Sequence, residues 1–381
     1  MPSLQSKLPN IGTTIFSEMS ALACQYGALN LSQGFPDYPI DSRLSDLVER
    51  YLQAGKNQYA PMIGVAELRS RIQEKYRVVH DLTIDVEQEI TVTAGASEAI
   101  FTAIATLIRP GDEVVIFEPA YDCYAPTVAL FGGKVIPVRL MAPEFSIDWN
   151  YVQSLVTSKT RLIIVNNPNN PACRVFSEAD VNDLAQLVDR SNAFVLSDEV
   201  YEHLIYDGIR ANTLLSHPLL RERTLVVGSF GKLLHATGWK VGYCLAAAEL
   251  MTEFRKIHQF NVFSVHTPTQ YAIADYLSDD TYYEDLAKFF QRKRDFLLAG
   301  LADSRFEVLV PQGTYFVVLN YRSISDLPEK EFARELTIKH KVATIPLAAF
   351  YHDGFNQHCI RVCFAKQQET LIQAIAMLNM V

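Results

Sequence analysis

The chain has 381 residues, of which 49% are hydrophobic and 20% are charged, and its formal net charge at pH 7 is -9. This length exceeds the size at which one core usually stops growing, so we expect two domains. The negative charge argues against a nucleic-acid partner, because nucleic-acid binders normally carry a basic face.

The apolar runs and the first residues argue against a membrane protein. No run approaches the roughly 20 residues of a membrane helix, and residues 1–14 lack the pattern of a signal peptide. The six cysteines form no close C-x-x-C pair, and the nine histidines show no metal-ligand spacing. We therefore expect a cytoplasmic protein with reduced, mostly buried thiols and no metal site.

The first 45 residues form an irregular segment with one helical pattern, at residues 14–26, and a turn around Gly34. Because glycine has no side chain, this position predicts either a simple turn or a close approach of another group to the backbone. Helix patterns follow at residues 42–54 and 64–80.

From residue 89 strand patterns alternate with helix patterns, which is typical of a parallel sheet with crossover helices. The predicted strands are residues 89–93, 113–117, 135–139, 161–165, 193–196, 224–227 and 241–246. Helices are expected at residues 98–108, before residue 130, at 177–190 and over much of 250–301. The basic run 292–294 in the last of these indicates either a solvated face or a domain connector. The tail is a separate α+β unit, with strands at 315–319 and 359–364 and helices at 328–340 and 367–380.

Polar residues stand where several predicted strands end. The turn before the helix at 98–108 contains Ser97, and unpaired backbone N–H groups at a helix start suit a phosphate, although every such turn needs small residues. Two Asn-Pro pairs in residues 166–171 force an extended loop at a strand end, where open α/β sheets bind ligands. Asp198 directly follows a buried strand, where an acid is costly unless it meets a cation.

Two basic residues lie in apolar surroundings. Lys232 follows the strand at 224–227 among small residues, so it is either a surface loop lysine or an amine whose reduced proton affinity lets it attack a carbonyl. Arg361 lies inside the apolar strand 359–364, so it is either a surface arginine on an edge strand or a clamp for a carboxylate.

In this order the motifs resemble the class I aminotransferases, which are pyridoxal-phosphate (PLP) enzymes of fold type I. More narrowly, the chain is similar to the branch of kynurenine/glutamine transaminases and bacterial methionine aminotransferases. The likeness extends from residues 31–37 to 360–366 and is closest at S-F-G-K (229–232) and T-G-W-K-V-G (237–242).

The resemblance implies an α/β fold with a mostly parallel mixed sheet flanked by helices and a smaller α+β domain formed by the two termini. The implied division is an N-terminal segment 1–45 that joins the small domain, a large PLP-binding domain 46–280, and a small C-terminal domain 281–381.

The same resemblance assigns roles to residues of the cofactor site. Lys232 would form the internal aldimine with PLP and shuttle the proton of the substrate, while Asp198 would pair with the pyridine nitrogen. Asn170 and Tyr201 would hydrogen-bond the phenolic oxygen, and Tyr121 would lie against the ring. The phosphate would be held by residues from several segments, including one from a second subunit of a homodimer: Ala96, Ser97, Ser229, Lys240 and, across the interface, Tyr59.

The substrate would bind through its α-carboxylate to Arg361, assisted by Asn170 and the backbone of Gly34. The residues that the resemblance places around its side chain are aromatic: Phe16, Tyr59, Tyr121, Tyr124 and Phe350. We therefore expect a neutral donor, methionine or an aromatic amino acid such as kynurenine, and a 2-oxo acid acceptor.

Two positions depart from the wider family. Lys240 stands where that family usually has arginine, which is typical of the narrower branch and suits a phosphate oxygen. Ala172-Cys173 replaces the usual Thr-Gly after the second Asn-Pro, which predicts a differently shaped loop beside Asn170 and a Cys173 thiol that is either buried or open to oxidation.

Three other functions stay open at this stage. A PLP-dependent carbon–sulfur β-lyase would use the same lysine on the same fold. A PLP-binding regulator would need a DNA-binding extension, which the chain does not resemble, and a nicotinamide dehydrogenase would need a G-x-G-x-x-G run, which residues 93–97 do not supply.

Overall fold

A seven-stranded sheet, in the order β2-β8-β7-β6-β5-β3-β4, organises the middle of the chain in this computed structural model, which describes residues 4–210, 212–278 and 282–381. Its strands are β2 (Ile90–Thr93), β3 (Glu113–Glu118), β4 (Lys134–Arg139), β5 (Thr160–Asn166), β6 (Phe194–Asp198), β7 (Thr224–Ser229) and β8 (Gly242–Leu245). Only β8 runs against its neighbours, so the other six strands have their carboxyl ends at one edge. The predicted mostly parallel mixed sheet is confirmed.

Both faces of this sheet are covered by helices, which explains the continuous apolar runs of its strands. Alternate residues of β3 separate onto the two faces. Val114 and Ile116 pack with α4 (Ala96–Leu107), α5 (Tyr124–Leu130) and α10 (Ala248–Asn261), whereas Val115 and Phe117 belong to the core on the opposite face. The helices that complete the large layer are α2 (Ser42–Gln53), α3 (Ala66–His80), α6 (Trp149–Leu155), α7 (Glu178–Asp189), α8 (Pro218–Arg221) and α11 (Thr267–Tyr276).

The C-terminal part forms a second sheet, of four antiparallel strands in the order β12-β13-β10-β9. Its strands are β9 (Glu307–Leu309), β10 (Phe316–Asn320), β12 (Ile345–Pro346) and β13 (Cys359–Cys363), and its helices are α12 (Tyr282–Gly300), α13 (Glu329–Lys339) and α14 (Gln368–Leu378). Because β13 lies between two strands, Arg361 is not on an edge strand.

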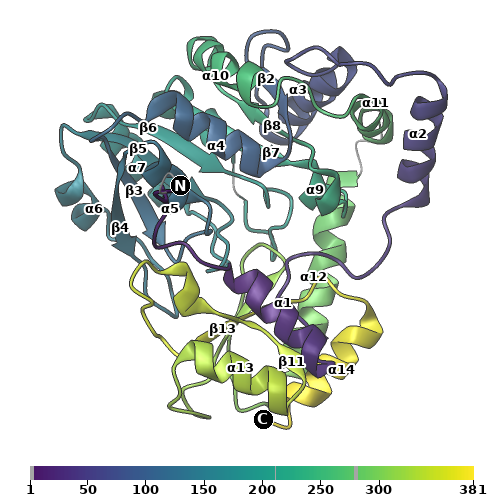
Figure 1. Ribbon diagram of the computed structural model, residues 1–381, viewed down its shortest axis with the longest axis vertical. Coiled ribbons are helices and arrows are strands. Elements are labelled where there is room, and N and C mark those ends of the chain that lie inside the picture. Colours follow the sequence, from purple (N-terminus) through teal and green to yellow (C-terminus); the bar gives the residue numbers. More distant parts are fainter. Residues whose placement is uncertain (1–3, 211, 279–281) are drawn as a thin grey trace.

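The N-terminal segment lies on this C-terminal unit, as Figure 1 shows by the purple helix α1 (Ile15–Tyr26) beside α13. In addition, β1 (Leu29–Asn30) pairs in parallel with β11 (Val342–Ala343). Contacts of this kind support the division at residues 45 and 280, which stays a prediction.

The helical stretch expected over residues 250–301 is divided into α10, α11 and α12. Within the basic run of α12, Arg292 is exposed, whereas Arg294 is only 4% exposed and its guanidinium pairs with Asp207 and Asp295. Asp207 lies between β6 and β7 of the large sheet, so Arg294 connects the two units. Among the residues described, no helix is both long and apolar enough to cross a membrane.

Candidate active site

A cavity of about 150 Å³ opens at the carboxyl ends of the large sheet. Every residue predicted to hold the cofactor within one subunit lines it: Ala96, Ser97, Tyr121, Asn170, Asp198, Tyr201, Ser229, Lys232 and Lys240. Tyr59 does not, since its side chain is 84% exposed outside the cavity.

Lys232 lies in the short helix α9 (Phe230–Leu233), which follows β7 directly. The Ser229 hydroxyl caps this helix by accepting a hydrogen bond from the Lys232 backbone N–H, 3.3 Å away. The Lys232 Nζ atom donates to the Tyr315 hydroxyl at 3.0 Å and to the Gly34 carbonyl at 3.3 Å. Burial lowers the pKa of this amine to about 8, so a substantial fraction is neutral and nucleophilic near neutral pH.

Asp198, the last residue of β6, is 4% exposed. Its carboxylate accepts hydrogen bonds from the Tyr124 hydroxyl at 2.6 Å and the Val200 backbone N–H at 3.3 Å. Burial raises the pKa of this carboxyl to about 6, and the two hydrogen bonds only partly oppose the effect. Lys232 in the same cavity lowers this pKa less than either hydrogen bond does, and the carboxylate forms no ion pair with any residue described, so the buried acid is poorly compensated.

Tyr124 lies elsewhere than expected. The sequence placed it around the substrate side chain, but its side chain is 2% exposed and its hydroxyl is bonded to Asp198. Because Tyr124 begins α5, one turn after Tyr121, its ring points into the core of the large unit while Tyr121 lines the cavity. We therefore assign Tyr124 to the support of Asp198.

The amino end of α4 forms a cradle with positive potential. Gly95 precedes it with a φ of 79°, and no side chain caps the helix. A Cβ atom on Gly95 would lie 3.3 Å from the Lys240 Nζ atom, so the ammonium stands beside the unpaired helix N–H groups. A helix start joined by a lysine suits a phosphate.

Arg361 is 1% exposed and bridges the two units. Its Nη1 atom donates to the Asn170 Oδ1 atom at 2.6 Å and its Nη2 atom to the Ser32 carbonyl at 3.0 Å. The Nε–H group is buried without a hydrogen-bond partner among the residues described. The Phe316 ring lies 3.8 Å from the guanidinium carbon, with Phe16 and Phe350 at 5.4 and 5.3 Å. A buried guanidinium held by rings and carbonyls is prepared for a carboxylate.

The loop after β5 keeps Asn170 in place. The Asn166 side chain accepts a hydrogen bond from the Asn170 backbone N–H at 2.7 Å and donates to the Asp198 carbonyl at 2.8 Å. Cys173 has a φ of 59°, a left-handed conformation that glycine adopts most easily, so this turn is formed without the usual glycine. Cys173 is 1% exposed and burial raises the pKa of its thiol to about 12, which makes it inert rather than oxidisable.

Gly34 confirms the close approach considered from its sequence. A Cβ atom there would lie 2.7 Å from the Phe316 ring, and its carbonyl accepts from the Tyr315 hydroxyl at 2.5 Å. Several site residues were not singled out from the sequence, among them Phe316 beside Arg361. Asn166 and Thr237 stood inside quoted motifs, whereas Tyr315 is the first residue of a predicted strand and no motif marked it.

Comparison with known proteins places this site in a family. Residues 27–378 match the family model "Aminotransferase class I and II". The chain belongs to this aminotransferase family.

Relatives of this aminotransferase share almost its whole length. It is 47% identical to the methionine aminotransferase of Escherichia coli, over 97% of this chain and 96% of that one. It is 36% identical to a probable N-succinyldiaminopimelate aminotransferase of Mycobacterium tuberculosis (98% and 97% covered) and 33% identical to a kynurenine–oxoglutarate transaminase of Dictyostelium discoideum (98% and 94% covered). The crystal structure of Escherichia coli YbdL, described as a methionine aminotransferase, superposes with a TM-score of 0.98 at 46% identity, covering 100% of both chains.

The aminotransferase is thus a PLP-dependent enzyme of fold type I that acts on an amino acid and a 2-oxo acid. The cavity fits this cofactor on two observations: the Asp198 carboxylate is buried and forms no ion pair with any residue described, and the start of α4 with Lys240 offers an anion site. When bound, PLP supplies an aldehyde for an amine and a protonated ring that accepts electrons.

Proposed function

We propose that this aminotransferase moves the amino group of a neutral amino acid, methionine or an aromatic, kynurenine-like one, to a 2-oxo acid. The observation that carries the proposal is the aromatic wall around Arg361, formed by Phe16, Phe316 and Phe350. Apolar rings favour an uncharged side chain, because a second carboxylate would lose water there without a cation in return. The 47% identical methionine aminotransferase supports the same choice.

Each site residue has a proposed task. Arg361, with Asn170 and the Gly34 backbone, binds the α-carboxylate of the substrate. Lys232 as a neutral amine would take the proton from the substrate Cα and, as an ammonium, give it to the C4′ atom of the bound cofactor. Asp198 would hold the ring nitrogen of the cofactor in its protonated form, and Tyr201 and Tyr121 would contact the ring. The phosphate would be held by the groups at the start of α4 and around it: Ala96, Ser97, Ser229 and Lys240.

The active unit that we propose is a homodimer in which Tyr59 reaches the phosphate of the partner. Three aromatic side chains near the end of α10 support it: Tyr59, Phe260 and Phe263 are 84%, 85% and 45% exposed, and the rings of Tyr59 and Phe263 are 5.6 Å apart. Exposed aromatic groups of this kind are typical of an interface. We place the enzyme in the cytoplasm, since its six cysteines are all unpaired, with four of them buried, Cys123 partly buried and Cys24 exposed.

A half-reaction panel tests the substrate. The change in cofactor absorbance is followed after mixing the purified enzyme with each of twenty amino acids and with N-succinyldiaminopimelate. Methionine and phenylalanine are expected to react at least about 10-fold faster, as kcat/KM, than aspartate, because one buried, unpaired charge costs more than 1.4 kcal/mol. Preference for aspartate or N-succinyldiaminopimelate would contradict the proposal.

Two further experiments test the role of Lys232 and separate the two reaction types. Lys232→Ala should lose at least about 10³-fold in rate, because both nucleophile and proton carrier are removed. Release of pyruvate and ammonia from cystathionine without a 2-oxo acid would indicate the β-lyase instead, although the family model and the named relatives favour transfer.

A further inference from the structure

Tyr315 joins three segments that are far apart in the sequence. It lies directly before β10 in the C-terminal unit and is 1% exposed. Its hydroxyl donates to the Gly34 carbonyl of the N-terminal segment at 2.5 Å and accepts from the Lys232 Nζ atom of the large unit at 3.0 Å. One hydroxyl therefore connects the amine that we assign to proton transfer with the backbone that we assign to the substrate carboxylate.

The direction of these hydrogen bonds is fixed by chemistry. Burial raises the pKa of the Tyr315 phenol well above its ordinary value, so the phenol keeps its proton. The Gly34 carbonyl can only accept, and it receives that proton. What Tyr315 offers to Lys232 is thus an oxygen lone pair, and Lys232 must be the donor. An acceptor stabilises the ammonium more than the neutral amine, so the hydrogen bond to the Tyr315 oxygen favours the charged form of Lys232.

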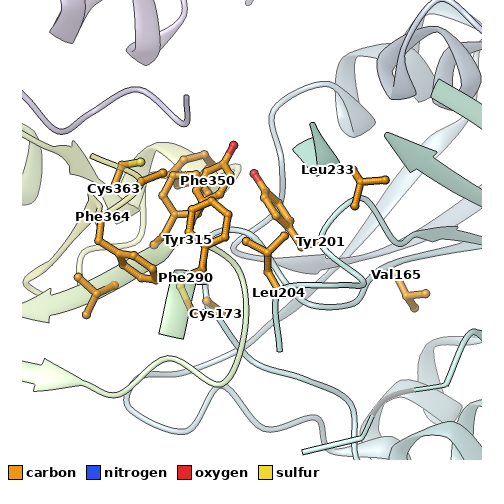
Figure 2. Packing of buried hydrophobic residues seen from close by; sticks show 14 of the residues in the cluster. Val165, Cys173, Tyr201, Leu204, Leu233, Phe290, Tyr315, Phe350, Cys363 and Phe364 are labelled. Atoms are coloured by element: carbon orange, nitrogen blue, oxygen red, sulfur yellow. The ribbon is translucent and has the colours of Figure 1, made fainter. Parts of the chain in front are cut away.

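Tyr201 completes the surroundings of the amine. The rings of Tyr201 and Tyr315 meet edge to face with centroids 5.1 Å apart, and Figure 2 shows their hydroxyl oxygens on the same side of the pair. The Lys232 Nζ atom lies 5.7 Å from one ring centroid and 5.6 Å from the other. The amine therefore lies beside this ring pair, about equally far from both centroids, and it donates its hydrogen bond to the hydroxyl of Tyr315.

The next residue contacts the carboxylate clamp. Phe316 lies 3.8 Å from the Arg361 guanidinium, while Tyr315 contacts Lys232. The turn that delivers both is tight, because Thr314 has a φ of 69° and its hydroxyl accepts from the Phe316 backbone N–H at 3.2 Å. Two consecutive residues, Tyr315 and Phe316, thus fix the relative positions of the Lys232 amine and the Arg361 guanidinium.

We propose that Tyr315 is a positioning residue for Lys232: its hydroxyl holds the free ε-amino group beside the Gly34 carbonyl and increases the proton affinity of that group. The proposal rests on the role of Lys232 as the proton carrier. In the enzyme form in which Lys232 is a free amine, Tyr315 keeps it at one place and stabilises the ammonium that forms when it takes the substrate proton.

The test measures Lys232 itself. The full-length protein without cofactor is labelled with an amine-acylating reagent across a pH series, and modification of Lys232 is quantified by mass spectrometry. In Tyr315→Phe the midpoint should fall by about one pH unit, because one hydrogen bond to a charged donor is lost. The matched control is Tyr321→Phe, since Tyr321 is 0% exposed, follows the same strand, and donates to the Leu327 carbonyl at 2.7 Å without touching Lys232.

An unchanged midpoint in Tyr315→Phe, or an equal shift in Tyr321→Phe, would overturn the proposal. If Tyr315→Phe does not fold, 3-fluorotyrosine at position 315 keeps the hydroxyl but makes it a weaker acceptor, so a smaller fall in the midpoint is expected and no change would overturn the proposal. Because labelling requires no turnover, the result is independent of which amino acid is the substrate.

The loaded enzyme gives a second readout. In Tyr315→Phe kcat should fall about 10- to 100-fold with a smaller change in KM, and the acid limb of the pH profile of the 2-oxo acid half-reaction should move to lower pH. Loss of rate without displacement of that limb would mean a merely structural role and would count against the proposal.

Discussion

At the scale of single residues, the site holds groups that are costly to the folded protein. The Asp198 carboxylate is 4% exposed, faces the cavity and is bonded only to a hydroxyl and a backbone N–H. Burial accordingly raises its pKa to about 6 and lowers the pKa of Lys232 to about 8. Two pKa values shifted in opposite directions within one cavity are typical of a reactive site, whose residues favour the reaction and lower the stability of the fold.

Asp198→Asn should stabilise the protein without cofactor and slow the enzyme. The pKa of Asp198 is raised on folding from 3.8 to about 6, so the carboxyl favours folding most below pH 4 and this contribution is lost as the pH rises through 6. An amide has no such dependence. The free energy of unfolding of the variant, relative to that of wild type, should therefore rise by about 3 kcal/mol from pH 4 to pH 7.5. Urea unfolding of both proteins at these two pH values measures this difference.

Equal differences between the two proteins at both pH values would contradict this account of Asp198. The same variant, supplied with cofactor, should transaminate at least about 100-fold more slowly, because an amide supports a protonated ring nitrogen poorly.

At the scale of elements, the turn after β6 is fixed by contacts on the side that faces away from the cavity. Asp198 and Tyr201 line the cavity, whereas Glu202 points to the opposite side. There its carboxylate pairs with Lys75 of α3 and accepts from the Tyr243 hydroxyl of β8 at 2.7 Å. Lys75 also donates to Tyr243 and is 4% exposed. A buried ion pair between α3 and this turn, joined by the Tyr243 hydroxyl of β8, therefore fixes the turn that carries two site residues.

Lys75→Met should cost about 3–5 kcal/mol of unfolding free energy, because it leaves the Glu202 carboxylate buried without its cation. Adding Glu202→Leu should recover most of this loss, since an apolar pair of similar volume is close to neutral. The control is Lys256→Met on α10, whose pair with Glu253 at 2.6 Å is 63% and 54% exposed and should contribute less than about 1 kcal/mol.

Urea unfolding of wild type, Lys75→Met, the double variant with Glu202→Leu, and Lys256→Met tests this prediction. A cost for Lys75→Met no larger than for Lys256→Met would show that the ion pair does not hold the turn.

At the scale of the whole molecule, the arrangement of Tyr59 predicts activity shared between subunits. Its ring is 84% exposed and outside the cavity of its own chain. If it serves the partner, Lys232→Ala and Tyr59→Ala subunits, each nearly inactive alone, should complement each other. Each mixed dimer would then contain one site with both changes and one with neither, so random mixing should restore roughly a quarter of wild-type activity.

Activity is measured after unfolding and refolding the two variants together, with each refolded alone as the control. Recovery no greater than the mean of the separate variants would contradict the shared site. Phe260→Asp should independently shift the protein toward monomer in sedimentation velocity, because it places a charge in the exposed aromatic patch.

The sequence by itself determined the order of strands and helices in the large unit and which residues stand at the strand ends. Apolar runs and small turn residues are local signals, so the loop 166–171, Asp198 and Lys232 were expected at strand ends. That Asn170, Asp198 and Lys232 share one site was implied by the resemblance to the class I aminotransferases.

Only the tertiary structure decided which side chains meet across that edge. Tyr124 was expected at the substrate and is bonded to Asp198, and Tyr315 was not singled out although it contacts Lys232. The run around Arg294 was expected to be either a solvated face or a domain connector, and Arg294 is buried in ion pairs. The physical reason is the separation of these residues in the sequence. Hydrophobic periodicity indicates only which face of its own helix or strand a residue occupies. These contacts join residues 74, 87 and 83 positions apart, and their distances are set only when the chain folds.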